Sequence, residues 1–223
     1  MTSGHVHHHP APAVEPRQVP AARLLATLAI AGAASGLLVV LVYRITLPAI
    51  QLYAGQQVEQ AVREVLKAPA RWDTLYLVED ALVSIPPEGV DKGELPKAFL
   101  GRDAAGKRTG VAVTAREPGF QEELLLMIGF EPASGALTGI KVLEQKETPG
   151  LGDKIVTDSS FGNQFPGQVP PLRRVRALTG GDRSEVQTIT GATISSRAVI
   201  RMINNAVARW QSLLAAFDRT AVR

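Results

Sequence analysis

A run of 20 uncharged residues near the N-terminus constrains this chain more than any other feature. It covers residues 24–43, reads LLATLAIAGAASGLLVVLVY, and has Arg23 and Arg44 at its two ends. Because an α-helix rises about 1.5 Å per residue, such a run covers about 30 Å, the thickness of a bilayer's hydrocarbon core. We therefore expect a single transmembrane helix over residues 21–47.

A cleaved signal peptide is the alternative interpretation of this run. The apolar core of a signal peptide has about 7–15 residues, and a small-x-small cleavage site follows it. This run is longer, and no convincing site of that kind follows it, so we favour a retained anchor. The charges leave its orientation open, since Arg17 and Arg23 precede the span while Arg44 and Arg63 lie in the 20 residues after it.

Residues 1–20 are rich in proline and histidine, and we predict a flexible tail there. All four histidines of the chain fall in this tail: His5, His7, His8 and His9. A histidine tract can also bind metal, which is the alternative for this segment. The rest of the chain has neither histidine nor cysteine. Histidine acid–base catalysis, haem ligation by histidine, disulfides and cysteine-ligated clusters are therefore excluded from it, and we expect no metal site.

The charge pattern argues against nucleic-acid binding. The formal net charge is only +3, and the basic residues are scattered apart from Arg173, Arg174 and Arg176. A nucleic-acid-binding surface usually shows a basic stripe with aromatic residues between the charges. We expect no nucleic-acid partner.

The remaining pattern predicts an α+β fold, with an antiparallel sheet and packed helices in one domain over residues 48–223. A helix is expected over 49–67 and another over 194–217, where apolar residues recur at three- and four-residue steps. Strands are expected over 74–78, 81–85, 110–114, 123–130 and 137–143, with a hairpin turn at 131–136 that contains Pro132, Ser134 and Gly135. Residues 157–176 are expected to form a loop.

The segment TGATIS, residues 190–195, stands at the start of the last helix and is called here the Thr190 motif. Gly191 allows the backbone to bend closely, and the hydroxyl residues that follow can cap the helix. The free N–H groups and the positive end of the helix dipole favour a phosphate at this place. Helix-start rules alone favour structural capping.

The segment ETPGLGDK, residues 147–154, follows the strand over 137–143 and is called here the Glu147 loop. Pro149 and Gly150 indicate a turn, and Gly152 permits a further unusual backbone angle. A tight connection after a strand explains this pattern structurally. Functionally, it gives a glycine-lined surface where a flat ring can approach the main chain.

Together, and in this order, the two segments resemble the FMN-binding domain found in the G subunit of the Rnf electron-transport complex. They also resemble its relative, the C subunit of the sodium-translocating NADH:quinone reductase. The resemblance covers about residues 51–217 and includes the single N-terminal anchor. The Thr190 motif fits the family's flavinylation motif Ser/Thr-Gly-Ala-Thr-x-Ser/Thr, and ETPGLGDKI over 147–155 is the second signature. The short chain and the GDKI ending favour the Rnf protein.

The resemblance implies that the FMN phosphate is esterified to Thr193 by a flavin transferase, so Thr193 is a modified residue and no catalytic residue is expected. It implies that the ring is lined by the Glu147 loop, and that the partners are other subunits of a membrane electron-transport complex. It places the soluble domain on the periplasmic side of the inner membrane. The cofactor-binding residues expected are Thr193, Thr190, Gly191, Ala192, Ile194, Ser195, Glu147, Thr148, Pro149, Gly150, Leu151 and Lys154.

One departure and three alternatives remain open. Residues 117–123, EPGFQEE, begin like the family's Gly-aromatic turn, but the acidic pair Glu122 and Glu123 departs from the family pattern. The C subunit of the sodium-translocating reductase is one alternative, and a flavin-free, membrane-anchored binding or assembly module is another. A threonine-nucleophile hydrolase is the third; it needs a base beside Thr193, and Lys154 is the only remote candidate.

Overall fold

The computed structural model describes residues 20–90 and 95–221, so the histidine tract lies outside the described residues. The described chain divides into two units after Leu52. Helix α1 (Ala21–Val65) is 45 residues long and contains Pro48. The predicted span and the predicted helix over 49–67 are therefore one continuous helix, because a proline inside a helix removes one hydrogen bond without necessarily ending the helix.

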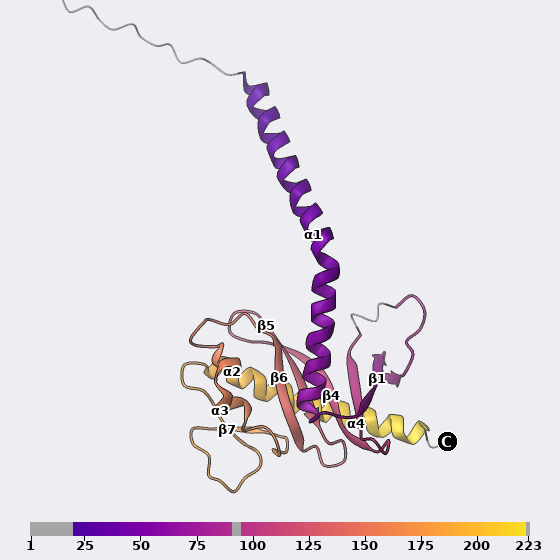
Figure 1. Ribbon diagram of the computed structural model, residues 1–223. Helices are drawn as coiled ribbons and strands as arrows, with labels where there is room; N and C mark the ends of the chain where they lie inside the picture. Colours follow the sequence, from indigo (N-terminus) through magenta and orange to yellow (C-terminus); the bar gives the residue numbers. More distant parts are fainter. Residues whose placement is uncertain (1–19, 91–94, 222–223) are drawn as a thin grey trace, which may run out of the picture. The chain divides into compact units, whose positions relative to one another are not determined.

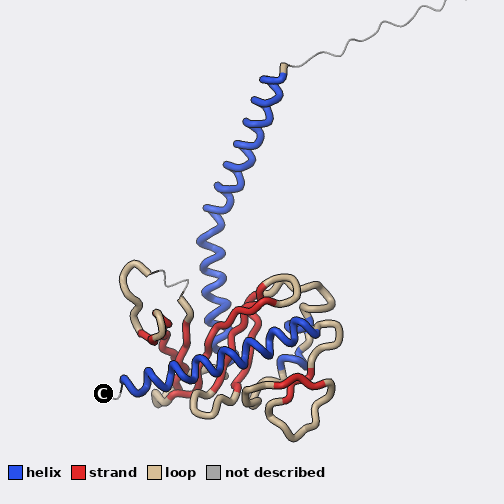
Figure 2. Tube along the Cα trace, turned by 180° about the vertical axis from the view of Figure 1, so that it is seen from behind, coloured by secondary structure: helices blue, strands red, loops and turns tan. Residues whose placement is uncertain are grey.

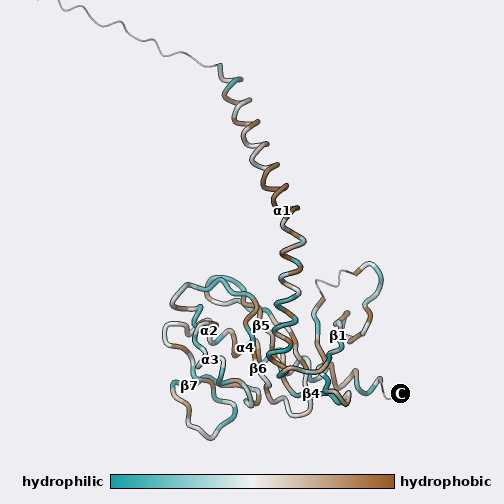
Figure 3. The backbone as a smooth tube through the Cα atoms, in the orientation of Figure 1, coloured by the Kyte–Doolittle hydropathy of each residue, from teal (hydrophilic) through white to brown (hydrophobic). Residues whose placement is uncertain are grey.

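Helix α1 begins as an apolar helix with an exposed surface. The side chains of residues 24–43 are all exposed, and Figure 3 colours much of this stretch as hydrophobic. Within residues 20–90 and 95–221, α1 is the one helix that is long and apolar enough to cross a membrane. This agrees with the predicted transmembrane helix.

The second unit is built on a six-stranded antiparallel sheet (Figure 1). The strand order is β2-β1-β3-β4-β5-β6, so only β1 is displaced from sequence order. The strands are β1 (Arg71–Val78), β2 (Ala81–Val83), β3 (Lys97–Arg102), β4 (Arg108–Pro118), β5 (Glu123–Phe130) and β6 (Leu137–Glu144). Strands β5 and β6 form the predicted hairpin, whose turn closes with a hydrogen bond from Glu131 N–H to Ala136 O of 2.9 Å.

Helix α4 (Thr193–Ala221) lies across one face of this sheet (Figure 2). Its predicted apolar stripe packs into the core: Ile203, Val207, Trp210 and Leu214 are buried, and Phe217 is partly buried. A smaller cluster unites the end of α1 with sheet residues; it contains Ala61, Val62, Val65, Leu66, Phe99, Ala112 and Met127. The α+β class with an antiparallel sheet and packed helices is confirmed.

Several short elements differ from the sequence expectations. Strand β3 was not predicted, and β4 extends on both sides of the predicted 110–114. The segment expected to be a loop contains small elements instead. These are α3 (Ser159–Gly162) and β7 (Arg173–Val175), which pairs in parallel with β8 (Glu185–Gln187), while α2 (Lys154–Thr157) ends where the segment begins.

Candidate cofactor site

The Thr190 motif forms the turn that opens α4. Gly191 has a φ of +87°, a left-handed conformation that favours glycine. The Ala192 N–H donates to Ile189 O at 3.1 Å, and the Ser196 N–H donates to Ala192 O at 2.9 Å. The first helical bond therefore starts at Ala192 O, so the N–H groups of residues 193–195 have no carbonyl in a preceding turn. These are the groups that bind anions at a helix N-terminus.

Thr193 is the first residue of α4, and its side chain is half-buried. Among residues 20–90 and 95–221, no side-chain or backbone group accepts from or donates to its hydroxyl. Because a capping hydroxyl would hydrogen-bond a backbone N–H of the first turn, this geometry does not use Thr193 as a cap. Its oxygen is available for substitution.

Glu147 lies in the interior beneath this turn. Its residue exposure is 5%. Its Oε2 accepts from the Ser195 hydroxyl at 2.7 Å, and its Oε1 accepts from the Phe120 N–H at 2.7 Å and, more weakly, from the Gln121 N–H at 3.4 Å. The Glu147 N–H itself donates to the Gln145 side chain at 2.7 Å. The two sequence signatures, about 40 residues apart in the chain, are therefore joined by a direct hydrogen bond.

Two glycines make room for the Glu147 carboxylate. A Cβ atom at Gly119 would overlap Oε1, and one at Gly152 would overlap Oε2. Gly152 is itself buried. Gly152 was expected to permit an unusual backbone angle, but the left-handed conformation is found at Gly150, with a φ of +75°. Gly152 instead leaves room for the Glu147 carboxylate against the main chain.

The Gly-aromatic turn forms despite the departure in sequence. The Gly119 N–H donates to Glu122 O at 2.9 Å, which closes the turn before β5. The Glu122 carboxylate pairs with Lys146 Nζ at 2.7 Å on the surface, and this pair raises the pKa of Lys146. Glu123 pairs with Pro118 in the β4–β5 ladder. Glu122 and Glu123 therefore contact residues other than Glu147, and the hydrogen bonds from this turn to Glu147 form as described.

The Glu147 loop contacts both neighbouring segments. Thr148 Oγ1 accepts from the Gln121 side-chain amide at 2.9 Å. The Leu151 N–H donates to Thr148 O at 3.1 Å, with Gly150 between them at a φ of +75°. A Cβ atom at Gly191 would meet Leu151 Cδ2 at 3.4 Å, so the Leu151 side chain lies against the Thr190 motif.

Lys154 and Thr190 lie on another side of the same segments. Both line an open hollow of about 640 Å³. The other lining residues are Thr157, Asp158, Ser160, Phe161, Gln164, Gln187, Thr188 and Ile189. Lys154 begins the short helix α2. The structure brings these two predicted residues together, at a position distinct from the Glu147 carboxylate.

The sequence reasoning missed the part played by Phe120 and Gln121. Their backbone N–H groups bind Glu147, and backbone donors leave no composition signal. The Gly-aromatic turn was the available signal. Each of the three joined segments also carries one exposed large apolar side chain: Phe120 is 61% exposed, Leu151 49% and Ile194 48%.

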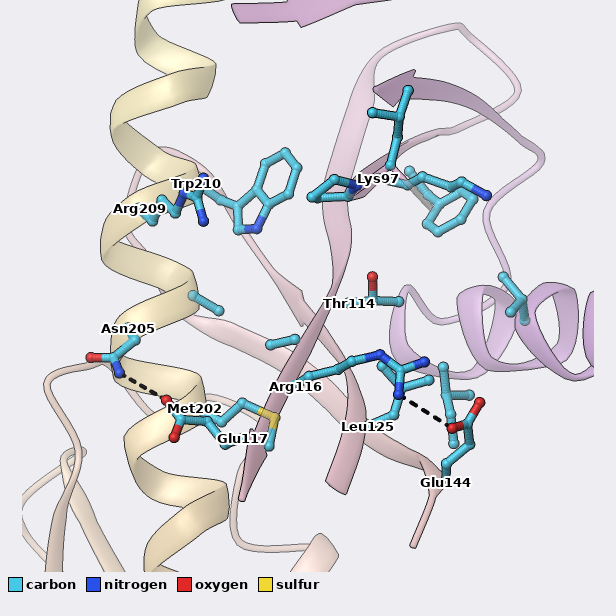
Figure 4. Close-up of a pocket in the computed structure, with 17 residues that line it drawn as sticks. Lys97, Thr114, Arg116, Glu117, Leu125, Glu144, Met202, Asn205, Arg209 and Trp210 are labelled. Atoms are coloured by element: carbon cyan, nitrogen blue, oxygen red, sulfur yellow. Dashed lines mark hydrogen bonds and ion pairs between the residues drawn. The ribbon is translucent and has the colours of Figure 1, made fainter. Parts of the chain in front are cut away.

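A cavity of about 600 Å³ lies elsewhere, between α4 and the ends of β3 and β4 (Figure 4). Arg116 and Glu144 pair at 3.4 Å on its rim, and the Asn205 amide donates to Glu117 at 3.2 Å. It shares no lining residue with the Thr190 motif or the Glu147 loop. Among the described residues, no group of three or more His, Cys, Asp or Glu side chains could hold a metal ion.

Comparisons with known proteins identify the family and the kind of domain. A family model described as "FMN-binding domain" matches residues 119–208, which contain all three joined segments. The G subunit of the ion-translocating oxidoreductase complex of Vibrio vulnificus is 34% identical over 188 residues, covering 81% of this chain and 85% of that protein. The chain belongs to this G-subunit family. The family's member in Methanosarcina acetivorans is 28% identical over 187 residues, covering 83% of this chain and 92% of that protein.

Two solved structures share the fold of this chain. NqrC of Shewanella oneidensis has a TM-score of 0.58 at 19% identity, and the match covers 72% of this chain and 97% of that one. The C subunit of the Na(+)-translocating NADH-quinone reductase from Parabacteroides distasonis has a TM-score of 0.57 at 20% identity, covering 75% and 96%. The predicted family and the predicted cofactor, FMN, are confirmed.

Proposed function

We propose that this chain is the FMN-carrying electron-transfer subunit of an ion-translocating oxidoreductase complex, with the FMN phosphate esterified to the Thr193 hydroxyl. The observation that carries the proposal is the first turn of α4. There, Thr193 has a hydroxyl that bonds to no other described residue, next to free helix N–H groups. The residues present fit the group: a phosphate on Thr193 meets the positive helix end, and Gly191 and Ala192 leave little bulk in its way.

FMN supplies the redox chemistry when it is bound, and the chain supplies attachment, orientation and shielding. Thr193 provides the linking oxygen. Residues 193–195 provide N–H donors towards the phosphate. Thr148, Pro149, Gly150 and Leu151 provide a surface for the ring on the exposed side of the Glu147 loop. With no histidine or cysteine after residue 9, the chain has no acid–base apparatus of those types, so we expect no independent catalytic activity.

We further propose an anchor over residues 21–47 and an FMN-binding domain over residues 48–223, on the periplasmic side of the inner membrane. Attachment of FMN then depends on a flavin transferase, and electrons are exchanged with the other proteins of the complex. Similarity to G-subunit proteins over most of the chain supports this assignment rather than the C subunit of the NADH-quinone reductase. The likeness to the two C-subunit structures, at 19% and 20% identity, supports the fold alone.

The test is Thr193→Val in cells that contain the flavin transferase. Valine has nearly the shape of threonine but lacks the oxygen needed for the phosphoester. The wild-type band should fluoresce under ultraviolet light on a denaturing gel, and the Thr193→Val band should be dark. If Thr193 had only a capping role, the change would cost about 0.5–2 kcal/mol of stability and nothing else.

Thr190→Val is the matched control for this test. It alters the same motif but keeps the proposed acceptor, so any flavin it carries should map to the peptide that contains Thr193. A fluorescent Thr193→Val band, or a wild-type chain with the mass of the bare polypeptide, would contradict the assignment. The same gel distinguishes the proposed flavoprotein from a flavin-free module and from a threonine hydrolase, since neither alternative predicts a fluorescent band.

A further inference from the structure

The buried polar residues of the described chain gather at two places. Glu147, Ser195 and Ser196 belong to the candidate cofactor site, and Glu185 lies in β8. Glu185 is held by a cation: Arg173 Nη2 lies 2.7 Å from its Oε1, and the Thr179 N–H and hydroxyl each donate to its Oε2 at 2.7 Å. Glu147 makes no ion pair with any residue in 20–90 or 95–221, and its oxygens bind only neutral donors.

A buried carboxylate without a cation is costly unless its oxygens are hydrogen-bonded. Glu147 meets this need with the Ser195 hydroxyl on one oxygen and the Phe120 N–H on the other, both at 2.7 Å. A carboxylate has two oxygens in a fixed plane, so it constrains its two donors relative to each other. Here one donor belongs to the turn before β5 and the other to the first turn of α4.

The Ser195 contact reaches the proposed flavin acceptor through the helix. Ser195 lies two residues after Thr193 in the same turn, and its hydroxyl is buried. Fixing Ser195 against Glu147 therefore fixes the start of α4 and the direction of the Thr193 Cα–Cβ bond. The Phe120 contact similarly fixes the turn that carries the exposed Phe120 ring.

We propose that Glu147 is the positioning residue of the flavin site. Its carboxylate holds the Gly119 turn, the Glu147 loop and the start of α4 in register. This arrangement presents the Thr193 hydroxyl for modification and fixes the three segments that carry the exposed side chains of Phe120, Leu151 and Ile194. The inference rests on the proposed attachment at Thr193. It gives Glu147 an interior role, in place of direct contact with the ring.

The test compares substitutions at Glu147 in the full-length chain, made with the flavin transferase present. Glu147→Ala removes both hydrogen bonds, and the covalent flavin per folded chain should fall about tenfold. Glu147→Gln keeps the side-chain length: its oxygen can accept from the Phe120 N–H, and its amide can donate to Ser195 Oγ. Glutamine should therefore restore most of the flavin. Flavin content is measured by intact mass.

Glu185→Gln is the matched control, because it changes a carboxylate that is at least as buried and that anchors a different loop. It should leave the flavin content at the wild-type level. Hydrogen exchange of the Phe120 and Gln121 amides gives a second readout that needs no flavin. Exchange at these amides should be faster in Glu147→Ala than in wild type, and unchanged in Glu185→Gln.

The outcomes separate this inference from the proposed function. A dark wild-type band would end the assignment of Thr193, while the exchange data would still test the contacts of Glu147. A fluorescent wild type together with a folded Glu147→Ala that carries full flavin would overturn the positioning role. If Glu147→Ala does not fold, Ser195→Ala tests the α4 contact alone. It should lower the flavin content, and full flavin content would again overturn the role.

Discussion

At the scale of single residues, the site depends on glycines whose backbone angles or neighbours exclude a side chain. Gly191 is constrained by its backbone angle, a φ of +87°, and a Cβ atom there would lie in ordinary contact with Leu151 Cδ2 at 3.4 Å. Gly150 has a φ of +75° but open space around it. The two glycines therefore differ in what a substitution would disturb.

Gly191→Ala should lower both stability and flavin attachment. Forcing a non-glycine residue into the left-handed region costs about 1–2 kcal/mol, and a backbone shift that relieves this strain would move the start of α4, which carries Thr193. Denaturant unfolding measures the first effect, and in-gel fluorescence measures the second.

Gly180→Ala is the control for this prediction. Gly180 has a φ of +80° and no atom within 4 Å of the Cβ position, and it lies in a loop outside the Thr190 motif. The control should lose a similar free energy of unfolding, about 1–2 kcal/mol, while keeping its flavin. Equal loss of flavin in both variants would show that strain alone, rather than the place of Gly191, limits attachment.

The sequence predicted the local structure of the Thr190 motif better than its contact with the Glu147 loop, and the cofactor-binding residues stay a prediction. The Thr190 motif was placed at a helix start because glycine and hydroxyl residues have strong local preferences there. The contact between Glu147 and Ser195 spans 48 residues. No local rule gives such a pairing, and a buried glutamate looks in sequence like any surface glutamate.

At the scale of secondary-structure elements, long periodic segments were predictable and short ones were not. Strand β5 has the predicted bounds, and α4 has the predicted apolar stripe. Strand β3 was missed although it is mostly buried, because its six residues KAFLGR contain no alternation of polar and apolar side chains. Its partners β1 and β4 determine that it is a strand.

Helix α4 should be the element on which the stability of the domain depends most. Ile203 is fully buried in the main core, between the helix and the sheet. Ile203→Ala should destabilise the domain by about 2–5 kcal/mol, since it removes buried methylene groups and leaves a cavity. Ser212→Ala on the exposed side of the same helix should change stability by about 0.5 kcal/mol or less.

This pair of variants also separates folding from modification. Ile203 lies more than two helical turns from Thr193, so a folded fraction of Ile203→Ala should accept flavin as the wild type does. The measurement is denaturant unfolding together with flavin content per folded chain. A cost under about 0.5 kcal/mol for Ile203→Ala would show that α4 is not packed in the core as described.

At the scale of the whole molecule, the described part of the chain contains an apolar helical unit and a sheet-containing domain. Helix α1 is continuous from Ala21 to Val65, and the boundary between the two units falls inside it, after Leu52. The last turns of α1 belong to the domain's packing through Val62 and Val65. The domain therefore begins within the helix that leaves the proposed membrane span.

The proposed periplasmic orientation can be tested because the charges flanking the span are balanced. A reporter that is active only in the periplasm, fused after Arg223, should be active, and a reporter active only in the cytoplasm should be inactive there.

A charge variant tests the same orientation. Substituting lysine for Gln51, Gln56 and Gln57, which are exposed on α1 after the span, would add three positive charges to the domain side. Because positive charges favour the cytoplasmic side, this triple variant should lose part of its periplasmic activity. Glutamates at the same three positions are the control, since acidic residues contribute little to orientation. A cytoplasmic reporter that is active after Arg223 in the wild-type chain would contradict the orientation, and with it any route to the flavin site from the periplasm.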